Sequence, residues 1–292
     1  GKNIPDSFAI INPNRKDCYY PFKGLCGAGV AFKLALAVCQ RGDFDVSKVW
    51  IHADIISLGI AADMVPIIDE NRIIATFGIN QINKRTNFGI SSLIKYGGLI
   101  NKHITIGRLV FWVAPKINAA GRLGDAARAV KLLTTMNPVR ADEIAQELEK
   151  ENNRRKDITL QMTNEAINMV ESKCDLKTEK IIVLHKVGWH PGVIGIVASR
   201  IKDIYSRPTI IIGFDKGEGK ASCRSIPSFN IYNALNDSKE YLVGFGGHPM
   251  AAGFSIKNEN YKNFKNKILD YANNNIIEKD LNPVLHIDAE LN

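Results

Sequence analysis

The stretch GFGGHPMAAGF, residues 244–254, combines a cluster of glycines with one imidazole. Gly246 and Gly247 directly precede His248, and Gly253 follows two alanines. Backbone N–H groups that no side chain shields, together with an imidazole, suit the oxygen atoms of a phosphate group. A tight turn with a hydrogen-bonded histidine is the alternative, and the residues alone leave both interpretations open.

A second phosphate-binding pattern is KASCRS, residues 220–225. Alternate residues of a strand point to the same face, so we expect Ser222 and Arg224 to lie side by side. A hydroxyl beside a guanidinium binds phosphate well, because arginine supplies several donors in a fork. Taken alone, the pattern fits an ordinary exposed arginine better.

A histidine precedes an expected helix in GWHPGVIGIVASR, residues 188–200. His190 and Gly192 lie where this helix begins, and the N-terminus of a helix attracts anions. We therefore expect His190 to contact substrate. A surface turn is the alternative.

The segment APKINAAGRLGDA, residues 114–126, places Asn118 and Arg122 around three small residues. Small residues let a ligand approach the backbone, and the polar pair suits contacts with a sugar, a base edge or a phosphate. The alternative is a helix cap and a turn that lead into the next helix, with Asp125 as the capping residue.

A lone carboxylate, Asp63, lies in apolar sequence surroundings within LGIAADMVP, residues 58–66. A carboxylate in such surroundings needs a partner, and a hard divalent cation is one possibility. Without further signals, an ordinary helix end before a proline-containing turn is favoured. We interpret the remaining candidates as structural: Asp54, His52, His103, His185 and His286.

The elements that must position these residues follow from the spacing of apolar and turn residues. Helical spacing predicts helices over residues 24–42, 53–62, 71–82, 91–96, 192–205 and 261–272. Short apolar runs predict strands over residues 9–13, 181–185, 209–213, 220–225 and 253–256. The strand–helix–strand order in the second half predicts a mixed α/β fold with buried strands.

A long helix is expected to connect two domains. From Asp125 to Glu171 there is no Gly and only one Pro, Pro138, and the apolar residues fall mostly three or four apart. The charged run at residues 149–157 leaves the middle of this helix little to bury, which is typical of a helix that bridges domains. We therefore expect a first domain over residues 1–135, a connecting helix over 136–172 and a second domain over 173–292.

Composition places the chain among globular proteins. Its 292 residues are 45% apolar and 23% charged, which argues against a disordered chain or a coiled coil. The net charge of +8 favours a polyanion such as nucleic acid, although the Asn, Lys and Ile bias of the second half can come from genome composition. Five scattered cysteines with no CxxC pair indicate free thiols in a reducing cytoplasm. No apolar run approaches the roughly 18 residues that span a bilayer.

The order of the motifs carries more information than any one of them. PFKGLCGAGVAFKL, LGIAADMVP, APKINAAGRLGDA, WHPGVIGIVASR, ASCRS and GGHPMAAGF follow one another along the chain. This series resembles the RecJ single-strand-specific exonucleases of the DHH–DHHA1 phosphoesterase superfamily, over residues 4–291. The GGH and AAG elements belong to the wider superfamily, whereas INAAGR and the first motif look like RecJ in particular.

The resemblance implies a 5′→3′ exonuclease that hydrolyses single-stranded DNA with two Mn²⁺ or Mg²⁺ ions, in DNA repair and recombination. It implies that Asp63 is a catalytic metal ligand and that Asn118 and Arg122 contact substrate. Nucleotide phosphate would be held by Ser222, Arg224 and His248 on a scaffold of Gly246, Gly247 and Gly253. Protein partners are not implied.

The chain departs from the family pattern at its beginning. The early aspartate-rich metal motif and the Asp-His-His motif are missing, and the nearest text, His52-Ala53-Asp54, does not match. We therefore expect a fragment: the C-terminal part of a DHH domain, the connecting helix and a DHHA1 domain, without the OB-fold that follows. We expect no nuclease turnover from these residues alone. The alternatives are a family phosphodiesterase acting on short RNA or cyclic dinucleotides, and a non-catalytic nucleic-acid-binding scaffold.

Overall fold

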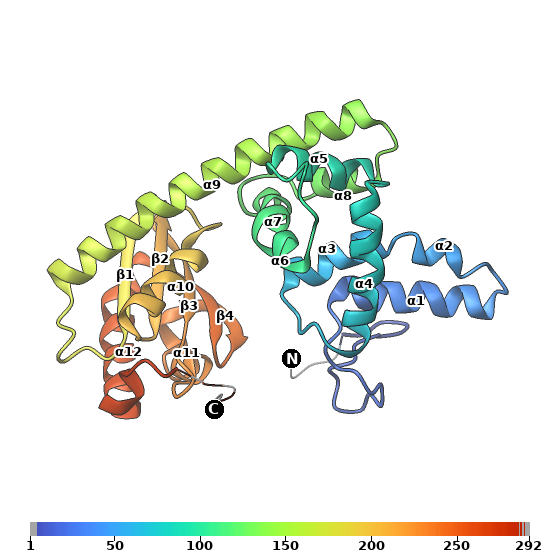
Figure 1. The fold of residues 1–292 in the computed structure, drawn as a ribbon. Helices are drawn as coiled ribbons and strands as arrows, with labels where there is room; N and C mark the ends of the chain where they lie inside the picture. Colours follow the sequence, from blue (N-terminus) through green and yellow to red (C-terminus); the bar gives the residue numbers. More distant parts are fainter. Residues whose placement is uncertain (1–4, 286, 288, 290–292) are drawn as a thin grey trace. The chain divides into compact units, whose positions relative to one another are not determined.

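The computed structural model describes residues 5–285, 287 and 289, so His286 lies outside the described residues. The chain divides into two compact units, residues 1–153 and residues 154–292. The long helix α9 (Pro138–Lys173) contributes its first part to one unit and its last part to the other (Figure 1). No helix in the described part of the chain is long and apolar enough to cross a membrane.

The described residues of the first unit form helices and loops only (Figure 1). Besides the start of α9, the elements are α1 (Gly27–Arg41), α2 (Ser47–Trp50), α3 (Ala53–Asp63), α4 (Asp69–Lys84), α5 (Phe88–Tyr96), α6 (Ile106–Arg108), a π-helical turn (Leu109–Val113), α7 (Ala114–Leu123) and α8 (Ala127–Thr134). Helices α3 and α4 cross closely at Gly78. Only glycine fits there, because a Cβ would collide with the Ala53 carbonyl and the Ser57 hydroxyl. The predicted helices of this unit are confirmed, with ends shifted by a few residues.

One prediction in the first unit is wrong. Residues 9–13 form no strand, since no described strand of this unit lies beside them to complete a ladder. The predicted connecting helix over residues 136–172 corresponds to α9, and Thr135–Asn137 separate it from α8. Pro138 opens α9, a position where its missing N–H costs nothing, and the Asn137 side chain accepts from the amides of Val139 and Arg140 at 3.0 and 3.2 Å.

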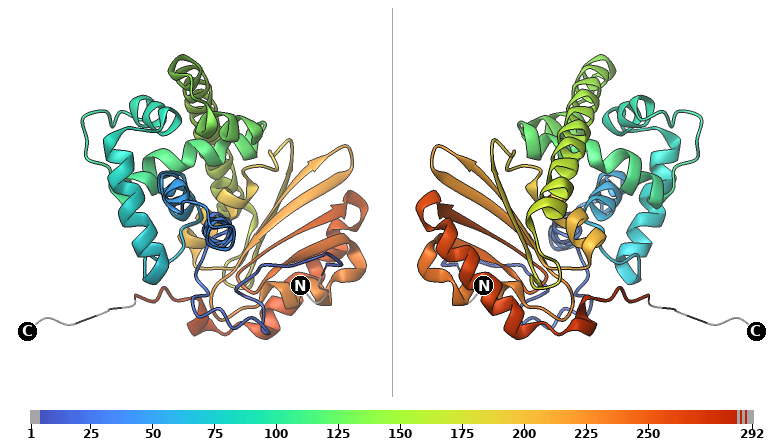
Figure 2. Two further views of the ribbon diagram at one scale, coloured as in Figure 1. Left: turned by 90° about the vertical axis from the view of Figure 1, so that its right-hand side faces the viewer. Right: turned by 90° about the vertical axis from the view of Figure 1, so that its left-hand side faces the viewer.

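The second unit is a five-stranded mixed sheet with helices on both faces. Its strands are β1 (Ile182–Val187), β2 (Thr209–Asp215), β3 (Glu218–Arg224), β4 (Leu242–His248) and β5 (Ala251–Lys257), in the order β1-β2-β3-β5-β4. Strands β1 and β2 are parallel, and the other pairs are antiparallel. The predicted mixed α/β fold is therefore confirmed. Figure 2 shows the twist of this sheet with α12 along one face.

Each face of the sheet is covered by different helices. Helix α10 (Ile194–Tyr205), which connects β1 to β2, packs on one face, and α11 (Ile231–Asp237) and α12 (Tyr261–Asn275) pack on the other. Three short 3-10 turns complete the unit: Lys239–Tyr241, Asn258–Asn260 and Glu278–Leu281. Strand β2 is buried along nearly its whole length, which explains its continuous apolar sequence. The glycine-rich stretch that could form a turn is instead strand β4.

Candidate nucleic-acid interface

Arg224, the last residue of β3, is fixed by neighbouring polar groups of the second unit. Its Nη1 donates to the Ser222 hydroxyl at 3.0 Å and to the Cys223 carbonyl at 2.8 Å. Its Nε donates to the hydroxyl of Ser199 on α10 at 3.2 Å. The predicted pair of Ser222 and Arg224 thus lies on one face, and α10 helps to orient the guanidinium.

Helix α10 leaves room for this guanidinium because residue 195 is glycine. A Cβ at Gly195 would lie 3.0 Å from both Arg224 Nη2 and Ser222 Oγ. Since Gly195 lies in the first turn of α10, the positive end of the helix dipole is beside the Arg224–Ser222 pair. The two features together favour an anion at this place.

The strand register brings the other predicted residues of this unit to the same place. Ser222 pairs with Gly253, which pairs with Gly246, and Arg224 pairs with Ala251, which pairs with His248. Residues directly opposite in antiparallel strands point to the same face. We call Ser222, Arg224, Gly246, His248 and Gly253 the sheet-end patch: two adjacent rows across three strands, with glycine where a side chain would stand above the strands.

Gly247 has a different role from its two neighbours. It pairs with Ala252, so it belongs to the opposite face of the sheet. Its φ of +150° disfavours other residues, and a Cβ there would collide with the backbone of Ala251 and Ala252. Gly247 therefore shapes the β4–β5 hairpin rather than lining the sheet-end patch.

The loop before α10 is held from both sides. The Trp189 ring is buried, its Nε1 donates to Glu165 on α9 at 2.8 Å, and Gly213 packs directly on its carbonyl group. Hydrogen bonds from Trp189 and Lys186 lower the pKa of Glu165. His190 follows, and its Nδ1 accepts from the amide of Gly192 at 3.0 Å. Its ring therefore closes the turn before α10, and its contact with substrate stays a prediction.

In the first unit, Asp63 and Asn118 line one cavity of about 300 Å³, together with Cys26, Gly27, Ala28, Gly59 and Ala62. Asp63 is the exposed last residue of α3, and Met64 follows in the left-handed conformation that ends the helix. Its neighbours in this lining are mostly small apolar residues, while the carboxylate itself is exposed. The structure brings Asp63 beside Asn118, which the sequence separates by 55 positions.

Asn118 and Arg122 lie inside helix α7 rather than in a cap or turn. Both are exposed one turn apart, while Ala119 and Ala120 between them are buried. The Nζ of Lys116 lies 2.5 Å from the Glu149 carboxylate on α9, and Arg128 lies 2.5 Å from Glu151. Asp125 accepts from the amide of Ala127 at 2.8 Å just before α8, but the N-cap position of α8 is Ala126, and the connecting helix α9 begins only at Pro138. Of the three small residues, Ala119 and Ala120 are buried and serve helix packing, whereas Gly121 is exposed.

The described residues alone do not make a metal centre. Among residues 5–285, 287 and 289 there is no cluster of three or more His, Cys, Asp or Glu side chains that could hold an ion. Asp63 offers one carboxylate at the rim of its cavity, and Asn118 is the other polar side chain in that lining. Oxygen ligands of this kind suit Mg²⁺ or Mn²⁺, but one carboxylate is too few.

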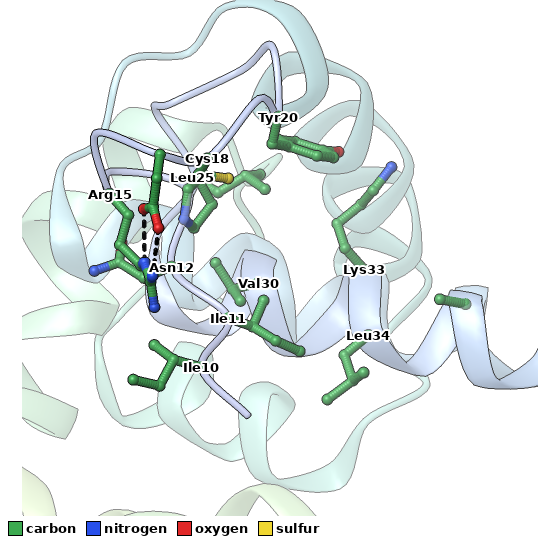
Figure 3. Close-up of a pocket in the computed structure, with 13 residues that line it drawn as sticks. Ile10, Ile11, Asn12, Arg15, Cys18, Tyr20, Leu25, Val30, Lys33 and Leu34 are labelled. Carbon is green, nitrogen blue, oxygen red and sulfur yellow. Dashed lines mark hydrogen bonds and ion pairs between the residues drawn. The ribbon is translucent and has the colours of Figure 1, made fainter. Parts of the chain in front are cut away.

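A larger hollow of about 470 Å³ lies between residues 10–25 and α1 (Figure 3). Its wall is mostly apolar, with Ile10, Ile11 and Val30, and on one side Tyr20 and Lys33 are both directed to Glu70 at 2.6 Å. None of the residues that line it belongs to the predicted site. It is therefore separate from the interface described above.

Several residues that position the candidate site residues were not predicted from the sequence. Gly195 and Ser199 are four apart in α10, so they lie on one helix face, and helical spacing could have found them. Glu165 and Glu149 were inconspicuous, because a glutamate in a charged helix gives no sign of a buried partner.

The second unit identifies the class of protein. Residues 178–275 match the DHHA1 domain, and the sheet-end patch lies within this range. The helical unit, the long helix and this domain together match the DHH–DHHA1 region of solved RecJ structures.

The particular family is RecJ. The chain is 41% identical to the single-stranded-DNA-specific exonuclease RecJ of Bacillus subtilis over 99% of its length and 36% of that protein. It is 36% identical to RecJ of Haemophilus influenzae over 100% of its length and 53% of that protein. The Mn²⁺ complex of Thermus thermophilus RecJ superposes with a TM-score of 0.81 at 32% identity, covering 93% of this chain and 39% of that one. The chain belongs to the RecJ family and spans about a third to a half of the length of these relatives.

Proposed function

We propose that the protein is a 5′→3′ exonuclease that hydrolyses single-stranded DNA, acting in DNA repair and recombination in the cytoplasm. The observation that supports this most directly is the sheet-end patch. There, three strands bring a guanidinium, a hydroxyl and an imidazole onto one face of the sheet, beside Gly246 and Gly253. The first turn of α10 lies next to the guanidinium. The relatives are named single-stranded-DNA-specific exonucleases, and these names suggest the substrate class.

In this proposal, the sheet-end patch binds a phosphate of the strand. Arg224 supplies forked donors and a permanent positive charge, and Ser222 adds a hydroxyl on the same face. Gly246 and Gly253 let the nucleotide approach the backbone, and His248 closes the row on the edge strand. In the other unit, Asn118 and Arg122 contact the strand through sugar, base edge or phosphate.

We extend the proposal to Mn²⁺ or Mg²⁺ as the cofactor of the complete protein, with Asp63 as one catalytic ligand. Solved RecJ structures contain these ions, which supports the metals but not the role of Asp63. Because one carboxylate cannot hold a pair of ions, we propose that these 292 residues alone have no nuclease turnover. Release of nucleotides from single-stranded DNA by this chain with Mn²⁺ would contradict that part.

The central experiment measures binding of a 5′-phosphorylated oligothymidylate to the chain at several salt concentrations. Arg224→Ala should weaken binding, and the loss should shrink as salt rises, because the contact releases counterions from the strand. Lys262→Ala is the matched control: it also removes one positive charge, but from the exposed side of α12 on the opposite face of the sheet. Equal losses of affinity in the two variants would show that only the net charge of the chain matters, and would refute the phosphate site.

The same assay separates the other two functions. Preference of the complete protein for dinucleotides over long DNA would indicate a phosphodiesterase of the wider superfamily. Binding without turnover in the complete protein, with Mn²⁺ supplied, would indicate a scaffold.

A further inference from the structure

Two exposed aromatic side chains stand next to each other just before helix α7. Phe111 is 76% exposed and Trp112 is 54% exposed, although both are large apolar residues. They lie in the π-helical turn Leu109–Val113, which continues directly into α7. Its π character is defined by the amide of Ala114, which donates to the Leu109 carbonyl five residues earlier. Such single π turns occur frequently at functional sites.

The opposite side of this helical segment is buried. Leu109, Val113, Lys116 and Ala120, which follow one another at intervals of four, three and four, are at most 4% exposed. Phe111 is two residues from Leu109 and from Val113, so its side chain is directed away from the buried stripe. Folding of the described chain therefore leaves this aromatic pair on the surface.

Two predicted substrate residues lie on the exposed side of the same helical segment. Asn118 is two residues from Lys116 and from Ala120, and Arg122 is two residues beyond Ala120; both are exposed. One continuous helical segment thus carries, in order, two aromatic rings, an amide and a guanidinium on its outer side. Exposed rings followed by a cation are the combination with which proteins bind unpaired nucleic-acid strands.

We propose that Phe111 and Trp112 form a stacking platform for the unpaired bases of the strand whose backbone Asn118 and Arg122 contact. This inference rests on the proposed function and adds where the bases lie. Every base has a flat face for stacking, so the platform would not select for sequence. It would select against a duplex, whose bases are already stacked on one another. The arrangement therefore supplies a physical reason for single-strand specificity.

The test compares two oligonucleotides of equal length and charge, one of thymidylate and one with an abasic backbone. The wild-type chain should bind the thymidylate strand roughly 5- to 150-fold more tightly, a range that corresponds to stacking of one base. The double variant Phe111→Ala, Trp112→Ala should bind both strands alike. Phe111→Tyr keeps a ring and should retain the preference, and it is the conservative variant.

Phe44→Ala is the matched control, because Phe44 is also a highly exposed phenylalanine of this unit, at 65%, but lies outside the helical segment. The Phe44→Ala variant should prefer the thymidylate strand over the abasic strand to the same extent as wild type. All three positions are exposed, so circular dichroism melting curves of the variants should coincide with that of wild type.

The outcomes separate the two proposals. If the double variant keeps the full preference for bases while Arg224→Ala still weakens binding, the platform is refuted and the proposed function stands. If the wild-type chain binds neither strand in a salt-dependent way, the proposed function fails, and the platform fails with it.

Discussion

The indole nitrogen of Trp189 donates a hydrogen bond to the carboxylate of Glu165 across 2.8 Å and so ties the loop before α10 to the long helix α9. Trp189 is only 4% exposed, so this N–H has no access to bulk water if its acceptor is removed. His190 lies in this loop and closes the turn before α10, and Ser199 on α10 accepts a hydrogen bond from Arg224. The glutamate thereby stabilises the approach to the sheet-end patch from a distant part of the sequence.

Replacement of this acceptor should destabilise the second unit. Glu165→Leu leaves the buried indole N–H unpaired, and we expect the free energy of unfolding to fall by about 1–3 kcal/mol. Urea denaturation followed by circular dichroism measures this. Lys186→Met removes only the ion pair of Glu165, at 3.0 Å and on an exposed side chain, and should cost less than about 1 kcal/mol. Equal losses in both variants would show that the charge pair, and not the indole contact, is the stabilising interaction.

The glycine in α10 gives a prediction in which stability and binding change in opposite directions. Gly195→Ala should raise the helix propensity of α10, by up to about 1 kcal/mol. Its new methyl group would lie 3.0 Å from Arg224 Nη2 and displace the guanidinium, so binding of phosphorylated oligothymidylate should weaken several-fold. Gly107→Ala is a helical control with open space around it, and should not affect phosphate binding. Unchanged affinity in Gly195→Ala would mean that Arg224 tolerates displacement.

The ion pair between Lys116 and Glu149 is largely buried, with side chains 5% and 22% exposed. No described group hydrogen-bonds to the paired Glu149 oxygen, so the lysine is its main compensation. Glu149→Leu should therefore cost about 3–5 kcal/mol, because it leaves a buried uncompensated ammonium group. The double variant Lys116→Met, Glu149→Leu should recover most of that loss.

Thermal and urea denaturation of the three chains test this prediction. The exposed pair Arg140–Glu143 is the control, and Glu143→Leu should change stability by less than about 1 kcal/mol. If the double variant is no more stable than Glu149→Leu alone, the loss arises from packing and not from the unpaired charge.

His185 predicts a pH dependence of stability. Burial lowers its pKa, and the positive charges of Lys265 and Lys173 lower it further. The folded chain therefore resists protonation that the unfolded chain accepts. Above the ordinary pKa of histidine, about 6.5, both states are neutral and there is no penalty. As pH falls below that value, the unfolded state gains protons first, so stability falls until the lowered folded pKa is reached.

The measurement is the slope of unfolding free energy against pH between 7 and 5. His185→Gln cannot titrate there, so its slope should be shallower than that of wild type, whatever its absolute stability. Parallel slopes would assign the acid sensitivity to other groups.

The elements were predictable from sequence where one signal dominated. Helices α3 and α4 and strand β2 have clear apolar spacing, and their predicted positions agree with the structure within a few residues. Strand β4 was missed, because Gly244, Gly246 and Gly247 lower strand propensity and only pairing with β5 makes them a strand. Residues 9–13 show the reverse: an apolar run without a neighbouring strand stays a loop.

Side-chain types identified the phosphate-binding candidates, but only the register showed that they meet. That Arg224 and His248 share a row depends on β5 lying between β3 and β4, an order that differs from chain order. The exposure of Phe111 and Trp112 depends on which side of their helix is buried, and that follows from tertiary packing.

The hairpin between His248 and Ala251 has only Pro249 and Met250 in its turn. Side chains alternate between faces along a strand, so adding or removing one residue there would invert the whole edge strand relative to its neighbour. His248 would then be directed to the helical core side while Arg224 kept its place. The hairpin should therefore tolerate exchange of its residues better than a change of its length by one residue.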